Sequence, residues 1–147
     1  MESSQRTNTK QRHQRIAEAA YFRAEKRGFE GGDPVADWID AEQEIDAEQK
    51  RAEHRRLIED LEERLATAGN KLKSLKRKVA SRTAAARAEL EEDIQRLAQL
   101  RESLAKRLDE VREQGLQAGH RARQQAEKLW LEIAEIAARH GARRRAK

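Results

Sequence analysis

Apolar residues recur every three or four positions along most of the chain, the spacing that places them on one face of an α-helix. The longest series begins at Ile58 and alternates steps of three and four, as in a heptad seam. Near Ala86 the steps become four and four, a stutter that locally unwinds a supercoil. The predicted coiled-coil seam comprises Ile58, Leu61, Leu65, Leu72, Leu75, Val79, Leu90, Ile94, Leu97, Leu104, Leu108 and Val111.

Two glycine-containing sites decide how far one helix extends. Gly69-Asn70 favours a turn, but the seam keeps its register across this dipeptide, so we expect the helix to continue. Gly115 and Gly119, only four residues apart, are the better candidates for a break. We therefore predict a long coiled-coil helix over residues 46–114 and a shorter amphipathic helix over residues 120–140.

A separate helical pattern precedes the seam. Its spacing predicts a helix over residues 13–27, which Gly28 ends by adopting a positive φ. Asp33 followed by Pro34 is typical of an N-cap and the first position of a second helix. Four of the five aromatic residues of the chain fall within residues 13–45. This clustering predicts a small hairpin core made of Ile16, Ala20, Tyr21, Phe29 and Trp38, with Trp38 at its centre.

The hairpin also carries residues whose order and spacing follow a known pattern, namely Ile16, Ala17, Ala20, Tyr21, Ala24, Glu25, Arg27, Gly28, Gly32, Asp37, Trp38, Ile39, Ala41 and Glu42. Over residues 13–45 this pattern resembles the short bacterial family called domain of unknown function 2934. The resemblance implies a bacterial protein with a helix–turn–helix-shaped hairpin. It implies no function, because none is established for that family.

The later part of the chain has a looser likeness. It combines the acidic segment 91–94, the leucine stripe, the glycine break and the tryptophan-bearing last helix with Trp130. In this it resembles a broad set of bacterial cytoplasmic coiled-coil proteins.

Composition agrees with an elongated all-α fold. Charged residues make up 40% of the 147 residues and aromatic residues only 3%, which leaves too few bulky side chains for a round core but enough for a seam between helices. We expect disorder only in two basic tails, residues 1–12 and 141–147. The chain has no cysteine, no apolar stretch long enough to span a bilayer and no secretory signal, so we expect a cytoplasmic protein.

No cluster of residues predicts an active site. The four histidines are scattered without the helical spacing that metal ligands need, so we expect solvated surface residues. The many carboxylates of residues 37–63 lack a pocket that could shift a pKa. We therefore expect no catalytic residue, no metal or cofactor site and no small-molecule substrate.

Charge along the seam is strongly uneven. Residues 37–63 carry eleven acids against four cations, whereas residues 66–88 carry seven cations and no acid. This division favours pairing with a second chain or a folded-back helix. The alternative is a nucleic-acid stripe that neutralises phosphates without reading sequence, assisted by the basic termini. Its residues would be Lys71, Lys73, Lys76, Arg77, Lys78, Arg82 and Arg87.

The last helix holds the most apolar patch of the chain, within residues 129–137, followed by a basic tail. Packing on the long helix or on a partner is one interpretation, and binding to an anionic membrane or granule surface is another. The patch residues are Leu129, Trp130, Ile133 and Ile136. We expect a non-enzymatic helical scaffold or protein-interaction protein that self-associates through the seam as a homo-oligomer or binds a helical partner, with nucleic-acid binding and peripheral membrane binding as alternatives.

Overall fold

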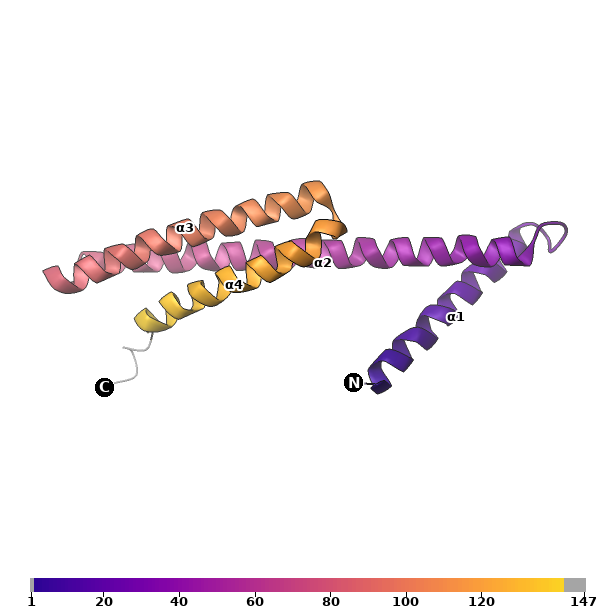
Figure 1. Ribbon diagram of the computed structural model, residues 1–147, viewed down its shortest axis with the longest axis horizontal. Coiled ribbons are helices and arrows are strands. Elements are labelled where there is room, and N and C mark those ends of the chain that lie inside the picture. The colour runs from indigo at the N-terminus through magenta and orange to yellow at the C-terminus, as the bar shows by residue number, and fades with distance from the viewer. Residues whose placement is uncertain (1, 142–147) are drawn as a thin grey trace. The chain divides into compact units, whose positions relative to one another are not determined.

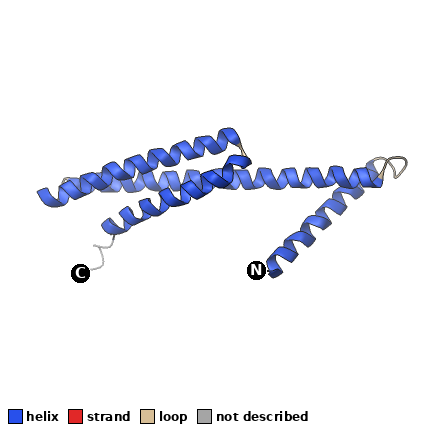
Figure 2. Ribbon diagram, in the orientation of Figure 1, coloured by secondary structure: helices blue, strands red, loops and turns tan. Residues whose placement is uncertain are grey.

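The computed structural model describes residues 2–141, apart from the side chains of residues 2, 3 and 116–118. Over this range it contains four helices and no strand (Figure 2), which confirms the prediction of an all-α fold. The chain divides into two compact units, Met1–Ala52 and Glu53–Lys147, and we call them the hairpin unit and the three-helix unit. The helices are α1 (Glu2–Lys26), α2 (Pro34–Val79), α3 (Ala84–Gln114) and α4 (Leu116–Gly141), and α2 contributes to both units.

The turn of the hairpin unit follows from its glycines and its cap. Past the end of α1, the Phe29 amide donates to the Ala24 carbonyl at 2.9 Å and the Gly28 amide donates to the Glu25 carbonyl at 2.8 Å. With Gly28 at a φ of 69°, these bonds form a Schellman motif. At the start of α2, the Asp33 carboxylate accepts the Val35 amide at 2.9 Å. The helix end at Gly28 and the cap at Asp33 were both predicted from sequence.

The expected disordered tail over residues 1–12 is corrected by α1, which begins at Glu2. Arg12, the last residue of that expected tail, makes two ion pairs that sequence spacing does not reveal. The Arg12 guanidinium reaches two carboxylates of α2, Asp46 and Glu42, at 2.8 Å each. The other expected tail, residues 141–147, lies outside the described residues except for Gly141.

The three-helix unit packs α3 and α4 alongside the later part of α2 (Figure 1). Its core is a single cluster of leucine, isoleucine, valine and alanine side chains drawn from all three helices. The buried members are Leu57, Leu61, Ala68, Leu72, Leu75, Leu90, Leu97, Leu100, Leu104, Leu108, Val111, Ala122, Ala126, Ile133 and Ile136.

The predicted unbroken helix over residues 46–114 is wrong, because α2 ends at Val79 and α3 starts at Ala84. The chain turns at residues 80–83, where the Ser81 hydroxyl donates to the Lys78 carbonyl at 3.1 Å. Thr83 adopts an extended conformation and its carbonyl accepts the Arg87 amide at 2.8 Å. The Ser81 hydroxyl competes for a carbonyl in the last turn of α2 and so favours the end of that helix, whereas the Thr83 side chain makes no capping hydrogen bond. The stutter near Ala86 therefore marks the start of a new helix.

The two glycine sites behave as the seam predicts. The helix α2 continues through Gly69-Asn70, whereas α3 ends at Gln114. Its C-cap, Gly115, has a φ of 65° and donates its amide to the Val111 carbonyl at 3.2 Å. The last helix starts at Leu116, four residues before the predicted start at residue 120, because Gly119 is accommodated inside the helix.

Candidate interaction surfaces

The core of the hairpin unit is smaller than predicted. Ile16, Ala41 and Ile45 are buried, and Ala20 and Trp38 are partly buried against them. The other two predicted core residues, Tyr21 and Phe29, are 54% and 60% exposed, so their assignment to the core is corrected. Tyr21 lies five residues after Ile16, about 140° further round a helix of 3.6 residues per turn, and is therefore displaced from the buried face of α1.

Three rings form an exposed aromatic cluster made of Tyr21, Phe22 and Phe29. The Tyr21 ring lies 5.9 Å from the Phe22 ring in an edge-to-face arrangement and 5.5 Å from the Phe29 ring, measured between centroids. Phe22 is 57% exposed. Phe29 has a φ of 58°, a conformation that bulky residues rarely adopt. The Schellman motif thus holds an apolar ring in solvent at a cost in backbone energy.

A groove of about 490 Å³ lies beside the cluster, and we call it the hairpin groove. Small side chains of α1 leave the space open, and the Trp38 ring of α2 borders it. The rings of Tyr21 and Phe29 belong to both the cluster and the groove. The lining residues are Ala17, Ala20, Tyr21, Ala24, Arg27, Phe29, Gly31, Gly32, Pro34, Asp37 and Trp38.

Ion pairs join α1 to α2 across the hairpin unit. Arg27 donates two hydrogen bonds to Asp37, at 2.6 and 2.5 Å. The Arg27 guanidinium lowers the pKa of Asp37 and in turn has its own pKa raised, mainly through these bonds. Arg12 lowers the pKa of Asp46 in the same way. Further pairs join Arg15 to Glu48 at 2.9 Å and Arg23 to Glu44 at 2.9 Å.

These ion pairs show which cations neutralise the acidic segment of α2, residues 37–63. Its first half, residues 37–48, is paired with arginines of α1 and with Arg27 just after that helix, all of which lie outside the basic stretch of residues 66–88. Further along, Glu62 pairs with Arg112 of α3. Acids of this segment are therefore paired with arginines of α1 and α3, and the predicted pairing with a second chain stays a prediction.

The predicted seam lies largely inside the three-helix unit. Eight of its members, among them Leu61, Leu97 and Leu104, belong to the buried core, and Ile58, Leu65, Val79 and Ile94 are partly buried against it. The seam prediction omitted Leu57, which is 8% exposed, because the heptad register was started one residue later at Ile58. These side chains therefore already have packing partners within their own chain.

Most cations of the basic stretch of residues 66–88 have side chains without a partner in the described part of the chain. Lys78 donates to the His140 carbonyl at 3.1 Å. Within residues 2–141, no hydrogen bond or ion pair engages the other six cations of the predicted nucleic-acid stripe. These six are Lys71, Lys73, Lys76, Arg77, Arg82 and Arg87.

The predicted docking patch on α4 is mostly internal. Ile133 and Ile136 are buried, and Leu129 and Trp130 pack against the same core. The guanidinium of Arg64 lies 5.5 Å from the centre of the Trp130 ring, in position for a cation–π contact. No helix among residues 2–141 combines the length and apolar character needed to cross a membrane.

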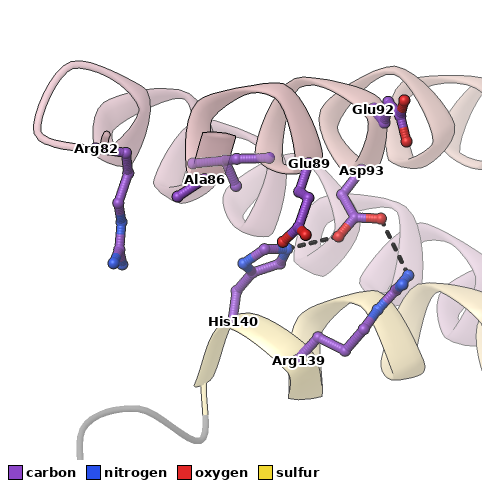
Figure 3. Close-up of a pocket in the computed structure, with 8 residues that line it drawn as sticks. Arg82, Ala86, Glu89, Glu92, Asp93, Arg139 and His140 are labelled. Atoms are coloured by element: carbon purple, nitrogen blue, oxygen red, sulfur yellow. Dashed lines mark hydrogen bonds and ion pairs between the residues drawn. The ribbon is translucent and has the colours of Figure 1, made fainter. Parts of the chain in front are cut away.

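Two of the histidines that we expected to be solvated instead have partners. His54 contacts the Val111 carbonyl at 2.7 Å, and His140 contacts the Asp93 carboxylate at 2.7 Å. Asp93, on α3, also accepts a hydrogen bond from Arg139 at 3.0 Å, so two neighbouring residues of α4 converge on it (Figure 3). These contacts fasten the end of α4 to α3.

The pocket around Asp93 has a volume of about 480 Å³, and charged residues line most of it. A histidine–aspartate pair supports acyl transfer only when a serine, cysteine or threonine stands beside the histidine. The described lining contains none of these nucleophiles. Among residues 2–141, no three or more histidine, cysteine, aspartate or glutamate side chains are grouped so that they could hold a metal ion.

Comparison with known proteins agrees with the hairpin resemblance. Residues 11–47 match the family described as "Protein of unknown function (DUF2934)", which confirms the similarity seen in the sequence of the hairpin. Neither the search of curated proteins nor the search of solved structures finds a match.

Proposed function

We propose that this chain is a non-enzymatic helical scaffold of the bacterial cytoplasm that self-associates through its hairpin unit. The exposed aromatic cluster is the observation that carries the proposal. Five of the six large hydrophobic residues exposed in the described chain belong to this unit, and they are Tyr21, Phe22, Phe29, Val35 and Ile39. Exposed apolar side chains gathered in one region are typical of an interaction surface.

The small core of the hairpin unit supports the same proposal. Three buried apolar side chains are few for a unit of 52 residues, and small folds usually gain stability from a partner, a metal or a disulfide. The chain has no cysteine. A partner that covers the exposed apolar side chains would bury additional apolar surface and so stabilise the hairpin unit.

A second copy of the chain is the partner that the hairpin fits best. The hairpin groove and the rings of Tyr21 and Phe29 lie on the same unit, so a ring of one copy can enter the groove of the other. A two-fold interface requires this kind of self-complementary surface. The arginines of α1 that face α2 are already paired with carboxylates, which reduces repulsion between two identical hairpins.

The seam is a weaker candidate for self-association than the hairpin. Its leucines pack inside the three-helix unit, so a second chain could reach them only after that unit opens. Opening would expose several leucines, each of which contributes about 1.5–3 kcal/mol when buried.

The test is the mass of the full chain, measured by light scattering over a range of protein concentrations. We expect a mass near twice the chain mass of 16.9 kDa. Tyr21→Ser with Phe22→Ser should return the mass to that of one chain. Four rings per dimer would be lost, at about 1.5 kcal/mol or more each, which corresponds to a weakening of about four orders of magnitude.

A matched control distinguishes this interface from nonspecific hydrophobic association. Leu131→Ser removes an equally exposed hydrophobic side chain, 62% exposed, from α4 in the other unit. Serine has a helix propensity close to that of tyrosine and phenylalanine, so α1 should remain folded, which circular dichroism can verify. A single-chain mass for the unaltered protein, or an unchanged dimer in the double variant, would reject the hairpin interface.

A further inference from the structure

A second groove lies between α2 and α3 in the three-helix unit, and we call it the α2–α3 groove. It has a volume of about 570 Å³. Its apolar lining consists of aliphatic side chains, among them Leu65, Leu72 and Leu108, and no aromatic side chain lines its described walls. Four cations border it, namely Lys73, Lys76, Arg101 and Arg112.

The charge of the α2–α3 groove is largely uncompensated. Its one acid, Glu62, pairs with Arg112 at 2.5 Å, and Arg112 also lies 3.7 Å from Asp109. Within residues 2–141, Lys73, Lys76 and Arg101 have no hydrogen bond or ion pair. Three free cations therefore converge on one concave surface, and Arg77 on the same stretch of α2 is also unpaired.

Gly69 explains why Arg101 can lie across the α2–α3 groove. A β-carbon on Gly69 would come within 3.3 Å of the Arg101 Nε atom, which is closer than such contacts normally are. Glycine inside a helix costs about 1 kcal/mol relative to alanine. Its presence in the middle of α2 thus makes room for a cation that α3 extends over α2.

We propose that the α2–α3 groove binds the phosphodiester backbone of a nucleic-acid duplex without reading its sequence. Lysine and arginine neutralise phosphates and release the counterions of the duplex. Single strands are bound by stacking bases on aromatic side chains, and this groove offers aliphatic walls instead. Lys73 and Arg77 are about 6 Å apart along the helix axis, over which a duplex presents about three to four charges.

The experiment is fluorescence anisotropy of the full chain with a short labelled duplex of random sequence, in DNA and RNA versions. The basic ends of the chain will add a background, so the quantity to compare is the slope of log affinity against log salt. Lys73→Gln with Lys76→Gln should reduce the magnitude of that slope by about 1.8, and adding Arg101→Gln should reduce it by about a further 0.9. Between about 50 and 200 mM salt, three phosphate contacts correspond to a loss of roughly 40-fold in affinity.

The matched control is Lys128→Gln with Arg123→Gln, which removes two exposed cations of α4 that have no partner among the described residues. Glutamine has a helix propensity close to that of lysine and arginine, so all variants should fold, and circular dichroism checks this. A shallower dependence of log affinity on log salt in the groove variants, with no such change in the control variant, supports the proposal. Binding to only the DNA or only the RNA duplex shows which nucleic acid the groove takes and still supports the proposal.

Four results would overturn it. These are the absence of binding at low salt, an equal loss of slope in the groove and control variants, tighter binding of the corresponding single strand, and tighter binding of labelled polyglutamate than of the duplex. The last result would assign the groove to an acidic protein.

Discussion

Replacing Gly69 with alanine tests how Arg101 is accommodated without removing any charge. Two effects oppose each other. Alanine favours the helix over glycine by about 0.8–1.0 kcal/mol, whereas its β-carbon would lie 3.3 Å from the Arg101 Nε atom. Arg101 is an exposed side chain without an ion pair among the described residues, so it can move aside at little cost. We therefore expect Gly69→Ala to stabilise the three-helix unit by about 0.5–1 kcal/mol.

Urea unfolding followed by tryptophan fluorescence measures this change. Trp38→Phe should be the common background, because Trp130 then reports on the three-helix unit alone. With a urea dependence of about 2 kcal/mol per molar, the expected gain raises the midpoint by roughly 0.25–0.5 M.

A double-mutant cycle isolates the contact with Arg101. In an Arg101→Ala background the β-carbon meets no guanidinium, so Gly69→Ala should give the full gain of about 1 kcal/mol. The difference between the two backgrounds is the cost of displacing Arg101. Destabilisation by Gly69→Ala in both backgrounds would refute the reasoning, because the glycine would then be making room for something other than Arg101.

Two further predictions concern the hairpin unit, and Trp38 fluorescence in a Trp130→Phe background reports on both. Gly28→Ala should destabilise this unit by about 1–2 kcal/mol, because the residue has a φ of 69° and a β-carbon would meet no atom within 4 Å; an unchanged urea midpoint would contradict this. The lowered pKa of Asp37, caused by its bonds to Arg27, contributes stability above the pKa of the unfolded state. That stability should disappear as the pH falls below about 4, and Asp37→Asn should reduce this acid dependence; an equally steep acid transition in the variant would exclude Asp37 as a source.

Local signals in the sequence located the helix ends that depend on special residues. Gly28, Asp33 and Gly115 each act within a few residues, through positive φ angles or a side-chain cap, so their effect is visible in the sequence. The end of α2 at Val79 was missed because residues 80–83 contain no glycine or proline. The competing hydroxyl bond of Ser81 is a weaker signal, and the three-and-four spacing of apolar residues continued across it.

The surfaces were less accessible to sequence analysis than the elements. The clustering of Tyr21 and Phe29 with the other aromatic residues favoured a core, but a narrow contact between α1 and α2 fully buries only Ile16, Ala41 and Ile45. The cations of residues 66–88 were visible as a stretch. Their neighbour Arg101 in the α2–α3 groove was not, because it comes from another helix.

The sequence by itself determined that this chain is helical, since periodic apolar positions and good helix formers act through local contacts. It also determined that one face of each long helix would be buried. Only the tertiary structure decided what covers that face, because a leucine seam packs equally well against a second chain or against a later helix of its own. The turn at residues 80–83 brings α3 back onto α2, so the seam becomes an internal core. The exposed rings of the hairpin and the unpaired cations of the α2–α3 groove are then the surfaces that we propose bind other molecules.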